Sequence, residues 1–149
     1  MDPEARVLGL DVGRRRIGAA LAEGELGAIT GLETIPRGTL REDVERLAAL
    51  AARVRATLIV VGLPLHLNGS ESPMAKEARR VAERLSKACA APVEMHDERL
   101  TSVAAEERLA AQGWNLKRML AEKKKGAVDQ MAARVLLEDW MSQHQGGGQ

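Results

Sequence analysis

Two patterns of hydrophobic and polar positions alternate along the chain and predict strands and helices in turn. Residues 6–13, 17–24 and 26–37 are rich in aliphatic side chains and are joined by short polar links, a pattern typical of antiparallel hairpins. Residues 56–64 form a continuous apolar run, as expected for a strand at the centre of a sheet that is covered on both faces. A fifth strand is predicted to end near Asp97.

Apolar residues at helical spacing lie between and after the later strands. Helices are predicted over residues 40–55, 73–89, 101–113 and 127–143. Ser72 is the expected N-cap of the second helix, and residues 144–149 are expected to form a frayed tail. The order of elements predicts an α/β protein with a mixed sheet of five strands, the first three antiparallel, in one domain ordered over about residues 5–143.

Composition narrows the class of protein. The chain has 149 residues, 45% of them hydrophobic, which is enough for one domain with its own core. Its 22 Lys and Arg nearly balance its 21 Asp and Glu, so any basic nucleic-acid footprint must be local. The chain has no Phe and no Tyr, so a nucleic-acid interface would recognise backbone and shape rather than stack bases on aromatic rings.

The remaining sequence features favour a cytoplasmic protein. A single cysteine, Cys89, excludes an intramolecular disulfide and a cysteine-based zinc site, and it suits a reducing compartment. The acidic, polar N-terminal residues are not typical of a signal peptide. The longest apolar run, residues 56–65, is too short to span a bilayer, so no membrane association is expected.

Acidic residues stand where the predicted elements begin or end. Asp11 lies within the first strand, Asp97 and Glu98 lie at the end of the fifth, and Asp129 lies in the first turn of the last helix. Open α/β sheets place their sites at such positions, and carboxylates that meet there repel each other unless a cation lies among them. Oxygen ligands select Mg²⁺ or Mn²⁺, and two such ions about 3.5–4 Å apart would activate water for phosphodiester hydrolysis.

Each acid also has a simpler explanation. Asp11 is placed to form a turn before Gly13, and Asp97 and Glu98 are placed to pair with Arg99 on the surface. Asp129 is favoured at a helix N-terminus by the backbone dipole. Only the combination of these acids in a mixed sheet favours a metal site.

Four motifs occur in order along most of the chain, from about Arg6 to Trp140. They are GLDVGRRRIGAA, VVGLPLHLNGSES, HDERLTS and KKKGAVDQMAARVLL, and together they resemble the motifs of the YqgF/RuvX family. The resemblance implies a ribonuclease-H-like fold related to that of Holliday junction resolvases. It also implies an activity described for the family either as processing of pre-16S rRNA or as resolution of DNA junctions.

The resemblance also implies roles for individual residues. It makes Asp11 the metal ligand of the first strand, Glu98 the second acid and Asp129 the acid of the last helix. Asp97 is either a further ligand or a residue that supports one. The basic run before Asp129 is shorter here than in many members of the family, which leaves the substrate contacts on that side open.

Several basic residues and one serine are candidates for phosphate contacts near these acids. The nucleic-acid-binding candidates are Arg14, Arg15, Arg16, Ser70, Arg99, Lys123, Lys124 and Lys125. The alternative for the lysines is an ordinary solvated face. Gly62 and Pro64 are expected to shape a turn before the Ser70 loop, and the alternative for this loop is a plain strand-to-helix connector. The three histidines lack metal-ligand spacing and are assigned no chemistry, and the two tryptophans are predicted to be packing residues.

The sequence therefore favours a divalent-metal-dependent endonuclease. Its expected substrate is the 5' end of precursor 16S rRNA, in ribosome biogenesis, and the alternative substrate is a Holliday junction in DNA recombination. A second hypothesis is a non-catalytic nucleic-acid-binding module that acts with the ribosome or the transcription machinery. A third, a piece of a nucleotide-binding kinase, is disfavoured by the absence of a Walker-type loop. Both a monomer and a homodimer remain compatible with the sequence.

Overall fold

The computed structural model describes residues 1–66, 68–98 and 127–147 of the chain. Its strands are β1 (Arg6–Val12), β2 (Arg16–Glu23), β3 (Ala28–Gly31), β4 (Ile35–Pro36), β5 (Leu58–Leu63) and β6 (Val93–Asp97). Its helices are α1 (Leu40–Arg53), α2 (Pro73–Ala88) and α5 (Ala127–Gly147). The helix predicted over residues 101–113 lies outside the described residues.

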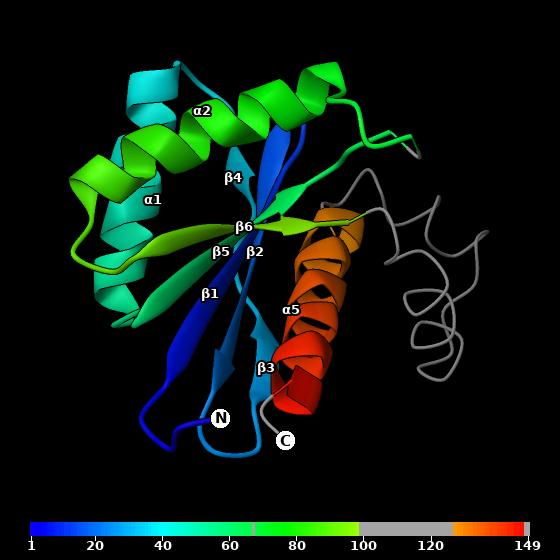
Figure 1. Cartoon of the computed structure of the whole chain (residues 1–149). Coiled ribbons are helices and arrows are strands. Elements are labelled where there is room, and N and C mark those ends of the chain that lie inside the picture. Colours follow the sequence, from blue (N-terminus) through cyan, green and yellow to red (C-terminus); the bar gives the residue numbers. More distant parts are fainter. Residues whose placement is uncertain (67, 99–126, 148–149) are drawn as a thin grey trace.

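The strands form one mixed sheet with the order β3-β2-β1-β5-β6, and β4 also pairs with β2. The β1–β2 and β2–β3 pairs are antiparallel, whereas β1, β5 and β6 run parallel. Helices α1 and α2 cover one face of the sheet, and α5 covers the other (Figure 1). The predicted α/β class and mixed sheet are confirmed.

The strand count differs from the prediction, because the third predicted strand is divided in two. β3 pairs with β2 in a register that places Gly31 opposite Ala20, whereas in β4 Ile35 lies opposite Ile17. The second pairing is displaced by one residue relative to the first, so one extra residue has to be accommodated between them. The sheet therefore has six strands rather than five.

Side chains alternate between two cores, one on each face of the sheet. Leu10 of β1 and Val61 of β5 belong to the core beneath α1 and α2. Val7 of β1 and Val60 of β5 belong to the core beneath α5. Because successive side chains of a strand point to opposite faces, the odd-numbered positions of β1 and the even-numbered positions of β5 face α5.

Helix α5 packs closely on the centre of the sheet. A Cβ atom added to Gly9 would lie 2.5 Å from Cγ of Leu137, so glycine in β1 is what allows this approach. Trp140 is buried, as predicted for a packing residue, and its indole N–H donates to Glu94 of β6. His144 stacks on Trp140, and the helix continues to Gly147, past the predicted end at residue 143.

The starts of the two helices on the other face follow their capping residues. Thr39 and Glu42 form a reciprocal capping box before α1. The hydroxyl of Ser72 accepts the N–H of Ala75 at 3.0 Å, which confirms the predicted N-cap of α2. Within the described ranges, no helix combines the length and the apolar character that crossing a membrane requires.

Candidate active site

Asp11 lies near the end of the central strand β1, on the face that α5 covers. Leu10 is the last β1 residue paired with β5, opposite Val61, so Asp11 lies level with Gly62 of β5. The alternation along both strands turns Asp11 and Gly62 to the same face of the sheet. Asp11 is half-buried there.

Glu98 follows directly after β6 and folds over Gly62. Its backbone N–H donates to the carbonyl oxygen of Leu63 at 3.1 Å, which continues the parallel ladder by one residue. A Cβ atom at Gly62 would lie 2.7 Å from Cδ of Glu98 and 2.8 and 2.9 Å from its two oxygens. Glycine in the middle of β5 thus leaves the space that the Glu98 carboxyl group occupies. The prediction that Gly62 shapes a turn was wrong, because Gly62 belongs to β5.

The Glu98 carboxyl group therefore lies beside Asp11, because neighbouring strands in a sheet are about 4.8 Å apart. Burial, as the largest cause, and the negative charges of Asp11, Asp97 and Asp139 together raise the pKa of Glu98 from 4.5 to about 8. Without a cation, this carboxyl group is mostly protonated at neutral pH. The structure thus brings together three of the predicted acids, Asp11, Asp97 and Glu98.

Asp139, on α5, is an acid near this site that the sequence did not indicate. Its carboxylate lies 2.6 Å from Nε2 of the buried His96 of β6 and accepts a hydrogen bond from the Gln143 side chain at 3.2 Å. His96, to which the sequence assigned no chemistry, thus ties α5 to the strand that ends at Asp97. Glu94 and His96 alternate along β6 and therefore share one face of the strand. This pattern could have indicated the contact only if α5 had been known to cover that face.

The donor set suits a hard divalent cation but is not complete within the described residues. Among them, no group of three or more His, Cys, Asp or Glu side chains is arranged to hold a metal ion. Asp129 lies in the first turn of α5, and its side chain is outside the described part. The buried carboxyl oxygens of Glu98, next to Asp11 and with room provided by Gly62, are the kind of ligands that Mg²⁺ and Mn²⁺ prefer.

The predicted phosphate-binding residues are only partly described. Arg14 and Arg15 are exposed in the turn after β1, and Arg16 begins β2 and is half-buried. The Ser70 hydroxyl donates to Oδ1 of Asn68 at 2.7 Å, so it helps to shape its own loop. Four further predicted residues, Arg99, Lys123, Lys124 and Lys125, lie outside the described residues.

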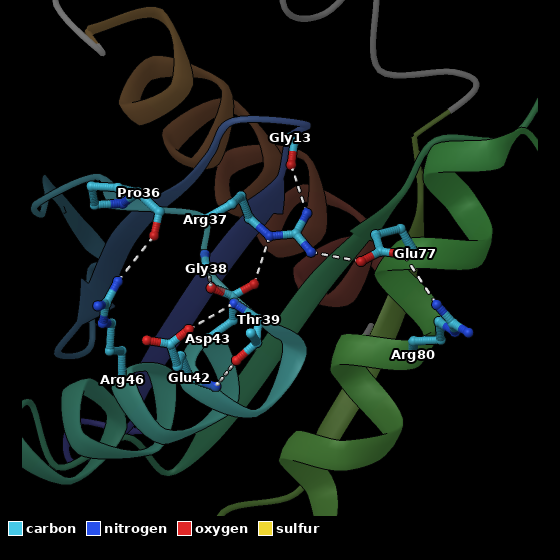
Figure 2. Close-up of polar contacts among 10 residues, drawn as sticks. All are labelled: Gly13, Pro36, Arg37, Gly38, Thr39, Glu42, Asp43, Arg46, Glu77 and Arg80. Atoms are coloured by element: carbon cyan, nitrogen blue, oxygen red, sulfur yellow. Dashed lines mark hydrogen bonds and ion pairs between the residues drawn. The ribbon is translucent and has the colours of Figure 1, made fainter.

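A polar network centred on Arg37 supports the turn that carries Arg14. Figure 2 shows the Arg37 guanidinium pointing toward three oxygen partners from different elements. It donates to the Gly13 carbonyl at 2.9 Å, to Asp43 of α1 at 2.7 Å and to Glu77 of α2 at 2.6 Å. Because Gly13 is two residues from Asp11, this network links the end of β1 to both helices of that face. Sequence reasoning missed it, because no local spacing relates these residues.

The carboxylates of Asp43 and Glu77 stabilise the charged form of Arg37. Burial alone would lower the pKa of Arg37, but the carboxylates of Asp43 and Glu77 outweigh it and raise the pKa. Asp43 is completely buried, and its second oxygen accepts the backbone N–H of Gly38 at 2.8 Å. A buried charge that is paired and hydrogen-bonded in this way is tolerated, whereas the same charge without its partner is strongly unfavourable.

We expect Gly62→Ala to destabilise the protein by about 1–3 kcal/mol, because the added methyl group overlaps the Glu98 carboxyl group. Urea unfolding with and without Gly62→Ala in the wild-type, Glu98→Ala and Glu98→Gln backgrounds would measure the coupling. In a Glu98→Ala background the cost of Gly62→Ala should fall markedly. In a Glu98→Gln background, where a side chain of the same size remains, the cost should persist. Equal costs in all three backgrounds would contradict the contact.

We expect the metal-free protein to lose stability as the pH rises from about 4.5 to about 8. Over this range the unfolded chain has lost the Glu98 proton while the folded chain retains it, because the folded pKa is about 8. The loss should be on the order of 4 kcal/mol relative to Glu98→Gln, which lacks this titration. Urea unfolding in chelator at several pH values measures it. Parallel pH profiles for the two proteins would contradict the burial of Glu98.

Two solved structures share the fold of this chain over most of its length. Thermus thermophilus RuvC in complex with a Holliday junction substrate matches with a TM-score of 0.59 at 14% identity, over 93% of this chain and 97% of that one. The large terminase nuclease of the thermophilic phage G20c matches with a TM-score of 0.58 at 18% identity, over 91% of this chain and 81% of that one. The chain therefore has the ribonuclease-H-like fold that the resemblance implied.

The family model of RuvX, described as a Holliday junction resolvase, matches residues 5–143. The chain belongs to the RuvX family. A relative from Anaeromyxobacter sp. (strain K) is 43% identical over 136 residues, which cover 91% of this chain and 96% of the relative. A relative from Synechococcus elongatus is 43% identical over 142 residues, which cover 95% and 91%. Both relatives carry the name "Putative pre-16S rRNA nuclease".

Proposed function

We propose that this protein is a divalent-metal-dependent endonuclease that hydrolyses phosphodiester bonds at the edge of the sheet where β1 and β6 end. The observation that carries the proposal is the Glu98 carboxyl group, held beside Asp11 in the space above Gly62 with its pKa raised to about 8. A buried acid next to other acids is destabilising unless a cation joins it. The chain belongs to a family in which relatives are named nucleases, and in a nuclease such a cation would activate water for hydrolysis.

Asp11, Glu98 and Asp129 are the residues proposed to hold the metal, with Asp97 as a further ligand or a support for one. Mg²⁺ or Mn²⁺, in a site for two ions, would supply Lewis-acid activation of water and stabilisation of the leaving oxygen. The chain's own part is to fix its carboxylate oxygens in place, which β1 does for Asp11 and Gly62 does for Glu98.

The basic residues are proposed to position the substrate. Three arginines follow β1 within five residues of Asp11: Arg14, Arg15 and Arg16. There they would bind phosphates on either side of the cleaved bond. Arg37 orients that turn through the Gly13 carbonyl. Further phosphate contacts are proposed for Ser70, Arg99, Lys123, Lys124 and Lys125.

The proposed substrate is precursor 16S rRNA, cleaved near its 5' end in the cytoplasm during ribosome biogenesis. It follows from the names of relatives that are about two-fifths identical over nine-tenths of the chain. The second candidate is a Holliday junction, favoured by the description of the family model and by the likeness to RuvC. A junction resolvase would need two active sites, and hence a homodimer.

A cleavage assay distinguishes these candidates. Purified protein with Mg²⁺ or Mn²⁺ is offered three labelled substrates: an RNA spanning the 5' end of 16S rRNA, an unrelated single-stranded RNA and a four-way DNA junction. We expect cleavage of the precursor RNA, loss of cleavage in chelator and no cleavage by Glu98→Gln. Cleavage of the junction alone would favour the resolvase. Equal binding by both proteins without any cleavage would favour the non-catalytic module.

A further inference from the structure

The exposed face of α2 carries an unusual stripe of positive charge. Lys76, Arg80, Arg84 and Lys87 are all exposed, and the helical spacing of four, four and three residues places them in one row along the helix. The row lies opposite the buried side of the helix, which consists of Ala75, Ala78, Val81, Ala82 and Leu85. The stripe is therefore directed to solvent along nearly the whole helix.

The charge of α2 is unbalanced, whereas that of its neighbour α1 is balanced. α2 contains five Lys and Arg residues and two Glu residues, and one of these, Glu77, is bound to Arg37 at 2.6 Å. α1 contains three Arg residues and three acids. For a chain whose net charge is +1, α2 thus concentrates the positive charge on one surface.

Acids of the same helix balance only part of the stripe. Arg80 lies 3.7 Å from Glu77 and Lys87 lies 3.8 Å from Glu83, whereas Lys76 and Arg84 are in no ion pair of the described part of the chain. Lys76, Arg80 and Arg84 follow one another at a spacing of four residues, where like charges repel. In α1 the same spacing brings Arg41 within 3.3 Å of Glu45, a pair of opposite charges. A row of like charges gains stability only when a ligand of opposite charge lies along it.

The stripe begins at the same edge of the sheet as the candidate active site, but on the face opposite to the one that Asp11 faces. α2 starts at the edge of the sheet where β6 ends and runs across the face of the sheet (Figure 1). A hollow between the turn after β1 and the start of α2 is lined by Arg14, Arg37, Gly38, Pro73, Met74 and Glu77. Arg14 thus connects the site to the first turn of α2. From Lys76 to Lys87 the stripe is about 16 Å long, the axial length of about five base pairs.

We propose that the exposed face of α2 binds the phosphate backbone of the nucleic acid that flanks the cleaved bond. This inference rests on the proposed nuclease function and assigns to α2 the part of the substrate that lies outside the reacting phosphate. The contact is electrostatic and independent of sequence, so it raises affinity for long substrates and leaves the chemistry at Asp11 and Glu98 unchanged.

The test compares two double variants that each remove two positive charges. Lys76→Gln with Arg84→Gln removes half of the stripe, and both residues are outside the ion pairs of the described part of the chain. Arg53→Gln with Arg55→Gln removes the same charge at the end of α1, just before β5 begins, and it also removes the exposed ion pair between Arg53 and Glu33. Affinity is measured in chelator, which prevents cleavage, for 30-nucleotide RNA, a 30-base-pair DNA duplex and a six-nucleotide RNA, at several salt concentrations.

The α2 variant should bind both long nucleic acids about tenfold more weakly than wild type. Its slope of log affinity against log salt should be shallower by about 1.8 for the duplex and about 1.4 for the single strand. The six-nucleotide RNA should bind as before, and the thermal midpoint should be unchanged or higher, because repulsion along the helix is relieved. The α1 variant should resemble wild type.

The outcomes separate the two proposals. If wild type cleaves RNA or DNA with metal, but the α2 and α1 variants bind long nucleic acid equally well, the inference about α2 is wrong and the nuclease function stands. If wild type does not cleave, but the α2 variant alone loses affinity, the α2 surface stands and the nuclease function is wrong. If wild type binds no nucleic acid, both are wrong.

Discussion

Asp11→Asn is expected to cleave at least about 10³-fold more slowly than wild type at the same metal and substrate concentrations, while the protein remains folded. Asparagine has nearly the same size as aspartate but lacks the negative charge that we propose holds a divalent cation among the acids of the site. A metal site contributes several kcal/mol to stabilising the transition state, and each 1.36 kcal/mol corresponds to a factor of ten in rate. Single-turnover cleavage of the preferred substrate in Mn²⁺ measures the loss, and circular dichroism confirms the fold.

The control for Asp11→Asn is Asp2→Asn, the same chemical change at an exposed residue near the N-terminus. It should cleave at the wild-type rate. Affinity of Asp11→Asn for the substrate in chelator should be equal to or higher than that of wild type, because a negative charge has been removed beside bound phosphates. An Asp11→Asn protein that cleaves within about threefold of wild type would exclude Asp11 from the chemistry.

Arg37→Ala is expected to lower the free energy of unfolding by about 3–5 kcal/mol. The substitution leaves the carboxylate of Asp43 completely buried without its cation, and it also removes the hydrogen bond to the Gly13 carbonyl. Because Gly13 lies at the end of β1, cleavage should fall as well, even at temperatures where the variant is folded. Urea unfolding gives the free energy, and cleavage at low temperature gives the activity.

Two further substitutions separate the cost of an unpaired buried charge from the other effects of removing Arg37. Asp43→Asn in the Arg37→Ala background should recover part of the stability, because the unpaired charge is then gone. Arg46→Ala removes another arginine that donates to a nearby carbonyl, that of Pro36, but this arginine is exposed, so the cost should be within about 1 kcal/mol. A similar cost for Arg37→Ala and Arg46→Ala would show that the buried network is not important for stability.

The parts of the fold with a strong local period could be predicted from the sequence. The buried run of β5 and the amphipathic faces of α1 and α2 have apolar spacings with only one good structural solution, and Ser72 marks the start of α2. The third predicted strand was wrong as one piece, because a displacement of one residue in pairing leaves no mark in composition. Such a displacement depends on the partner strand β2.

Part of the candidate site could also be predicted, because two of its acids stand at recognisable positions in local sequence patterns. Asp11 was indicated by its place among strand residues, and Glu98 by its place after a strand, with the family resemblance giving both a role. The function of Gly62 and the contact between His96 and Asp139 could not be predicted. They depend on the register between β5 and β6 and on which face of the sheet α5 covers, and neither is encoded in a local pattern.

The most direct test of the central claim, that the acids around Glu98 gather to bind a divalent cation, is calorimetric titration of Mn²⁺ into the protein at pH 7. Wild type should bind Mn²⁺, and Asp11→Asn and Glu98→Gln should each bind it much more weakly. Repetition in buffers of different ionisation enthalpy should show about one proton released by wild type, because Glu98 has a pKa of about 8 and must ionise to bind the cation. Absence of binding by wild type, or binding that neither substitution weakens, would contradict the account.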